Sequence, residues 1–184
     1  WWLNTTSMTK IRLLLLLLGV AAQTLLPAQT HQQFFISNDD HTDYMWAGNE
    51  SQYSKAFINM LDYYIAQSDK TLTLPSFYQS RFNCDGTYWV WEYQKQKSAA
   101  DFGKLIDKIK SGHISIPYNV LVSCYGANST EGVLRGMYYA GHLERKYGLN
   151  LDQAVAMENQ TLPLGLSSLW AGSGAKYSWK GVCN

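Results

Sequence analysis

His41, Asp43 and Trp46 are the residues of this sequence whose types and spacing are best suited to chemistry. An imidazole nitrogen and a carboxylate oxygen together suit zinc, and two residues two positions apart in an extended segment point to the same side. Both groups could therefore reach one ion. The Trp three positions after Asp43 offers a flat apolar face of the kind on which a sugar ring stacks. Taken alone, the spacing is also explained by a chance H-x-D in a polar loop.

The segments that must position these residues alternate between short strands and amphipathic helices. Asn49 with Gln52 forms the start signal of a helix whose apolar residues share one face, and Ser98 with Asp101 forms another that ends at Gly112. Further helices are predicted from Asn128 to Tyr147 and from Leu166 to Ser173. Strands are predicted at 34–37, 80–84, 113–116, 154–157 and 177–182.

Strands separated by helices pair in parallel, which predicts an α/β fold with an open sheet or a partial β/α barrel. In both, functional residues gather beyond the carboxyl ends of the strands. Three polar clusters occupy such places: 38–43, Asp85 with Gly86, and 158–160. Turn and capping chemistry would explain each cluster separately.

Together these features resemble the amino-terminal catalytic domain of glycoside hydrolase family 38, the zinc-dependent α-mannosidases. That family has a strand followed by H-x-D-x-x-W, and segment 41–46 reads H-T-D-Y-M-W. It then has a strand that ends in an acidic nucleophile, an apolar segment with Pro and Gly, and a short helix closing in G-x-K/R. Residues 154–158, 162–166 and 174–177 follow this order. The resemblance covers residues 34–182.

The resemblance implies a role for each matched residue. His41 and Asp43 would bind Zn²⁺, Trp46 would stack on the mannose ring, and Glu158 would be both the nucleophile and a third zinc ligand. Hydrolysis of the α-mannoside would retain anomeric configuration. Asp85 is a further candidate for contact with the carbohydrate substrate.

The sequence departs from the family pattern at two places. Glu158 stands where the family has Asp, which moves the carboxylate by one methylene, and Tyr44-Met45 replaces the usual Pro-Gly. The family's fourth ligand, a His, and its general acid fall beyond residue 184, so a fragment of this length is expected to be inactive alone. The alternatives are a degenerate sugar-binding protein and a metal-dependent polysaccharide deacetylase, although the H-x-x-x-H pair usual in deacetylases is missing from the sequence.

The amino-terminal residues predict export. Lys10 and Arg12 precede a run of Leu, and small residues at Ala22 and Ala28 offer cleavage points, which predicts a signal peptide at 8–28 and a secreted or periplasmic protein. Residues 1–7 read as an upstream non-native segment and 29–184 as the catalytic-domain part. The apolar core of this signal is too short for a stable membrane span.

The amino-acid composition limits the classes of binding partner. A net charge of +1 shows no nucleic-acid footprint, and the oligomeric state is left open. Trp89, Trp91 and Tyr125 are expected in the core, with a sugar cleft as the alternative. Cys84, Cys124 and Cys183 are an odd set, in which the first two pair or all three are buried thiols.

Overall fold

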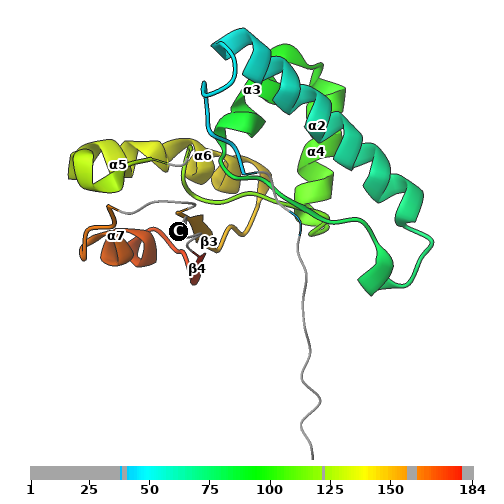
Figure 1. The fold of residues 1–184 in the computed structure, drawn as a ribbon. Helices are drawn as coiled ribbons and strands as arrows, with labels where there is room; N and C mark the ends of the chain where they lie inside the picture. The colour runs from blue at the N-terminus through cyan, green and yellow to red at the C-terminus, as the bar shows by residue number, and fades with distance from the viewer. Residues whose placement is uncertain (1–37, 39–40, 122, 157–160, 180–184) are drawn as a thin grey trace, which may run out of the picture. The chain divides into compact units, whose positions relative to one another are not determined.

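The structure is a computed structural model that describes residues 38, 41–121, 123–156 and 161–179 of the 184-residue chain (Figure 1). The chain divides into a unit of residues 1–36 and a unit of residues 37–184, and every described residue belongs to the second. The predicted signal peptide, the strand at 34–37, Glu158 and Cys183 therefore lie outside the described residues.

The first helix that the structure describes is α2, Glu50–Thr71. Asn49 accepts a hydrogen bond from the Gln52 backbone and the Gln52 side chain accepts one from the Asn49 backbone, which confirms the predicted capping box. The buried face of α2 carries Phe57, Leu61 and Ile65 at helical spacing. The sequence pattern thus predicts both the start and the core side of this helix.

Two more helices pack against α2. α3 spans Tyr88–Gln96 and α4 spans Ala99–Lys110, and the three helices contact one another in pairs (Figure 1). Ser98 caps α4 as predicted, and Gly112 follows it with a positive φ of 72°. α3 was not predicted, because its Tyr-Trp-Val-Trp run is rich in residues that favour strands. Its Trp89 is fully buried against Phe57, which confirms the expectation of a core residue.

The described strands form two parallel pairs. β1, Phe82–Asn83, pairs with β2, Ile114–Ser115, and β3, Gln153–Val155, pairs with β4, Tyr177–Trp179. The predicted parallel pairing is therefore confirmed. In the part of the chain that the structure describes, these are two separate two-stranded sheets and not a closed barrel.

Pro117 lies between the two sheets. It stands two residues after β2 and has no N–H to donate to a ladder. The next residue restores the connection, since the Tyr118 N–H donates to the Gln153 carbonyl at 2.9 Å. At the other side of β1, the Asn83 N–H donates to the Asn38 carbonyl at 3.2 Å. These bonds order the segments as Asn38, β1, β2, β3 and β4.

The remaining helices differ in detail from the sequence prediction. The helix predicted from Asn128 is two helices, α5 at Thr130–Gly136 and α6 at Tyr138–Tyr147, separated at Met137. Gly136, a poor helix former, ends the first of them. Ser129, not Asn128, is the capping residue. α7 spans Leu166–Gly172, and two short 3₁₀ turns lie at Ser76–Tyr78 and Tyr125–Ala127.

Two absences apply to this same part of the chain. No helix among the described residues is long and apolar enough to cross a membrane. Cys84 is buried, and Cys124 is exposed and forms no disulfide with a described residue. The structure therefore contradicts both alternatives that the sequence left open, because the first requires Cys124 to pair with Cys84 and the second requires Cys124 to be buried.

Candidate functional site

Asn119 joins the ends of the strands from which the candidate site is built. Its side-chain amide donates to the Asp85 carbonyl at 3.3 Å, and its Oδ1 accepts the Val155 N–H at 2.9 Å. Asp85 follows β1 and Val155 ends β3, so one buried side chain fixes the carboxyl ends of both sheets relative to each other. Sequence reasoning missed Asn119, and the signal that could have found it is an Asn three residues after the predicted strand at 113–116.

Gly86 allows the same segments to approach closely. A Cβ at this position would lie 2.2 Å from the Val120 carbonyl oxygen, a distance that no side chain permits. The close approach lets the Thr87 and Tyr88 N–H groups donate to the carbonyls of Asn119 and Val120 at 3.0 and 2.9 Å. The turn after β1 is thus held against the segment after β2.

The loop that carries the H-x-D pair lies against this turn. The Thr42 backbone N–H donates to Asp85 Oδ2 at 3.4 Å, which brings two of the three predicted polar clusters together. Asp85 is only 4% exposed, so it supports the loop from within. Residues 41–43, Asp85 and Asn119 are called the rim below.

His41 and Asp43 face each other in the rim. The His41 Nε2 and Asp43 Oδ1 atoms are 3.5 Å apart, and both side chains are partly exposed. Two ligand atoms at about 2.0–2.2 Å from a tetrahedral zinc lie roughly 3.3–3.5 Å apart. The donor types and their separation therefore fit a zinc ion. Among the described residues, no third Cys, Asp, Glu or His joins the pair.

The turn after Asp43 has a conformation that its sequence does not favour. The Trp46 N–H donates to the Asp43 carbonyl at 3.0 Å, and Met45 has a φ of 64°, in the left-handed region. A four-residue turn with positive φ at its third position favours Gly there and Pro before it. The chain keeps a backbone suited to Pro-Gly while carrying Tyr44-Met45.

Tyr44 gives this turn a different kind of support. Its ring lies edge-on to Tyr53 and Tyr88 at centroid distances of 5.5 and 5.4 Å and stacks near Phe57. Its hydroxyl forms a 3.3 Å hydrogen bond with the Tyr88 hydroxyl. Burial, this bond and the charge of Glu92 raise the pKa of Tyr88. Aromatic packing on α2 and α3 thus holds the loop where a proline would have stiffened it.

The other predicted site residues fall as follows. Trp46 is 86% exposed, so its ring is available to a ligand and is not part of the core. Glu158 lies outside the described residues, and its role stays a prediction. The last described residue before Glu158 is Ala156, which is buried. The first described residue after it is Thr161, whose carbonyl accepts the Gly126 N–H at 2.7 Å.

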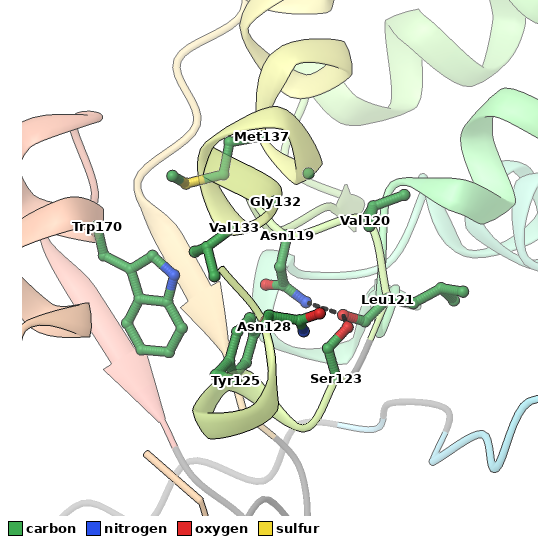
Figure 2. Close-up of a pocket in the computed structure, with 11 residues that line it drawn as sticks. Asn119, Val120, Leu121, Ser123, Tyr125, Asn128, Gly132, Val133, Met137 and Trp170 are labelled. Atoms are coloured by element: carbon green, nitrogen blue, oxygen red, sulfur yellow. Dashed lines mark hydrogen bonds between the residues drawn. The ribbon is translucent and has the colours of Figure 1, made fainter. Parts of the chain in front are cut away.

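A small cavity opens beside the rim, and sequence reasoning did not predict it. It has a volume of about 190 Å³ and lies among the chain after β2, helix α5 and Trp170 of α7 (Figure 2). Asn119 lines it as well as holding the rim. Tyr125 lies in its wall, so the expected core position of this residue is confirmed, and it is also a cavity residue.

The comparisons with known proteins give a likeness at the level of the fold. No protein-family model matches this sequence, and no curated protein is significantly similar to it. The fold is similar to that of a protein in glycosyl hydrolase family 38 from Enterococcus faecalis, with a TM-score of 0.52 and 15% sequence identity. The likeness covers 78% of this chain and 16% of that chain. It shows a shared fold over this region, and the chain spans about one sixth of the length of that protein.

Proposed function

We propose that this chain forms part of a retaining, zinc-dependent α-mannosidase of the secreted or periplasmic kind. The observation that carries the proposal is the His41–Asp43 pair, 3.5 Å apart between Nε2 and Oδ1, at the carboxyl end of parallel strands. The fold similarity to a glycosyl hydrolase family 38 protein supports the coarser assignment to a glycoside hydrolase. The identity of the sugar as mannose and of the metal as zinc is part of what we propose.

The proposal assigns a role to each of the candidate site residues. His41 and Asp43 hold the zinc, whose bound form supplies a Lewis acid for sugar hydroxyls. Trp46 stacks on the sugar ring from its exposed position, and Asp85 fixes the loop through the Thr42 N–H. Glu158 would supply the carboxylate that attacks the anomeric carbon while the glycosidic bond breaks and a general acid protonates the leaving oxygen. Water would then displace Glu158 from the sugar, and the two displacements together retain configuration.

The proposal is tested first by the metal. Purified protein is dialysed against zinc, and bound zinc is measured by atomic emission for the natural sequence, for His41→Ala and for Asp43→Asn. We expect zinc affinity to fall by about 100-fold or more, because even outer-shell partners of a metal are worth about 10–100-fold. His142→Ala is the matched control, since His142 is exposed on α6.

Hydrolysis of an aryl α-mannoside by the full-length parent protein, with and without chelator, tests the activity, because a fragment of this length is expected to be inactive alone. Activity that chelator abolishes and that Glu158→Gln removes supports the full proposal. Zinc binding without hydrolysis would instead favour a sugar-binding protein. Equal zinc affinity in His41→Ala, Asp43→Asn and the control would rule out the metal site. In a separate assay, release of acetate from an acetylated glycan would favour the metal-dependent deacetylase.

A further inference from the structure

The walls of the 190 Å³ cavity contain two buried donors that have no partner. The Tyr125 hydroxyl and the Trp170 Nε1 atom are buried and form no hydrogen bond with any described residue. The two residues are 5% and 7% exposed, and their rings meet edge-on at 5.6 Å. A buried polar group without a partner costs about 1–3 kcal/mol, so such groups mark places where a partner binds.

The lining of the cavity limits the chemistry of that partner. None of the described residues that line it carries a charge, so nothing there would compensate a phosphate, a carboxylate or an ammonium group. The side chains of Asn119, Ser123 and Asn128 are polar, while Val133 and Met137 give an apolar wall (Figure 2). A neutral ligand with several oxygen atoms and an apolar face fits both kinds of wall.

The size of the cavity limits the partner further. At about 30 Å³ per water molecule, a volume of about 190 Å³ corresponds to roughly six waters, which is the scale of one small ring and not of an oligomer. Tyrosine is protonated at neutral pH, and burial and the negative charge of Asp85 raise the pKa of Tyr125 further above its usual value. It therefore offers a hydroxyl hydrogen to an acceptor oxygen at neutral pH.

The cavity is joined to the rim through shared residues. Asn119 lines the cavity while its side chain donates to the Asp85 carbonyl, and the Asp85 carboxylate accepts the Thr42 N–H. A ligand in the cavity and an ion at His41 and Asp43 would therefore be supported by the same buried side chains.

We propose that this cavity is a subsite for a single neutral sugar ring, in which the Tyr125 hydroxyl and the Trp170 N–H donate to ring or hydroxyl oxygens. The inference rests on the proposed function for the class of ligand, but it does not require the metal. The subsite shares Asn119 with the rim and would take one sugar unit of the same glycan.

The test uses ligand-observed NMR titration of the zinc-free protein with methyl α-mannoside, and with inorganic phosphate as a charged probe. We expect saturable binding of the mannoside and none of phosphate. Tyr125→Phe should weaken mannoside binding by about 5-fold or more, the equivalent of one hydrogen bond. Trp170→Phe should act similarly because it keeps a ring and removes the N–H.

Tyr139→Phe is the matched control. The Tyr139 hydroxyl donates to Gln94 Oε1 at 2.7 Å, and neither residue lines the cavity. The subsite is refuted if the zinc-free protein binds no mannoside, or if Tyr125→Phe and Trp170→Phe bind as well as the control. Binding that depends on Tyr125 but occurs in a protein unable to bind zinc would keep the subsite and reject the proposed metal site. Zinc binding without a Tyr125 effect would do the reverse.

Discussion

Buried polar groups are treated differently in two regions of this molecule. In the helical layer of α2, α3 and α4, the Glu92 carboxylate is 4% exposed and accepts hydrogen bonds from Ser54, Lys95 and Gln96. At the rim and its adjoining cavity, the Tyr125 hydroxyl is equally buried and has no partner among the described residues. Completed networks stabilise a core, whereas incomplete ones are typical of binding sites.

Backbone conformation shows the same difference. Met45, next to the rim, is the only residue other than glycine with a positive φ in the part of the chain that the structure describes. The exposed side chain of Trp46 lies on the same turn. Strain and unsatisfied groups thus lie beside the candidate site, while the helical layer carries few of either, with the buried Trp89 Nε1 as an exception among its described atoms.

The largest expected effect comes from breaking the network in the helical layer. Glu92→Ala removes the acceptor of three side chains and should lower the free energy of unfolding by about 3 kcal/mol, as measured by urea denaturation. Glu131→Ala is the control, because its pair with Arg135 is exposed and contributes below about 1 kcal/mol. Equal effects of the two changes would contradict the assignment of a closed network.

The same residue gives this prediction a pH dependence. Burial raises the pKa of Glu92, but the hydrogen bonds from Ser54, Lys95 and Gln96 outweigh it and leave the pKa below its usual value of about 4.5. The stabilisation is therefore complete above about pH 4.5 and is lost as the pH falls through the folded-state pKa. Glu92→Gln should lose this part of the acid sensitivity.

The stability effects of two Tyr→Phe changes, one in each region, allow a direct comparison. The Tyr93 hydroxyl donates to Asp62 Oδ1 at 2.7 Å, so Tyr93→Phe should destabilise the protein by about 1–2 kcal/mol. Tyr125→Phe removes a buried hydroxyl with no partner among the described residues and should leave stability unchanged or raise it by up to about 1 kcal/mol. Thermal unfolding in the absence of sugar measures both. A larger loss for Tyr125→Phe than for Tyr93→Phe would show that its hydroxyl is satisfied.

The smallest expected effect concerns the turn at the rim. A residue other than glycine in the left-handed region costs about 1–2 kcal/mol, and glycine costs about 0.5–1 kcal/mol in chain entropy. Met45→Gly should therefore stabilise the protein by about 0.5 kcal/mol, and urea denaturation can measure this against Ala47→Gly, which should be destabilising. A loss of stability in Met45→Gly would mean that the Met45 side chain contributes more than its backbone costs.

The sequence predicted the local structure better than the site. Capping residues and apolar spacing were sufficient for α2 and α4, because those signals act within a few residues of the chain. Helix α3 was missed since tertiary burial of Trp89 and Tyr93 overrides the strand preference of its aromatic residues. The contact between Thr42 and Asp85 followed from parallel strands ending at one edge.

The rest of the site depended on information that residue types do not carry. Asn119 bonds partners 34 and 36 positions away, and the cavity beside it forms only when α5 and α7 pack near the same loop. The left-handed conformation of Met45 was hidden for a similar reason, because its Tyr44 neighbour is held by packing on α2 and α3. The His41–Asp43 pair was visible in the sequence, and its role as a ligand pair, like the role of Glu158, stays a prediction.

Pro117 has a consequence for how this molecule moves. Where a continuous sheet would share a ladder of bonds, the chain after β2 is tied to β3 by the Tyr118 amide and by the side chain of Asn119. Amide exchange in the two sheets would then follow two separate openings, since few bonds couple them. Because Asn119 bonds the ends of both sheets and also lines the cavity, opening at this junction would loosen the subsite and the rim together.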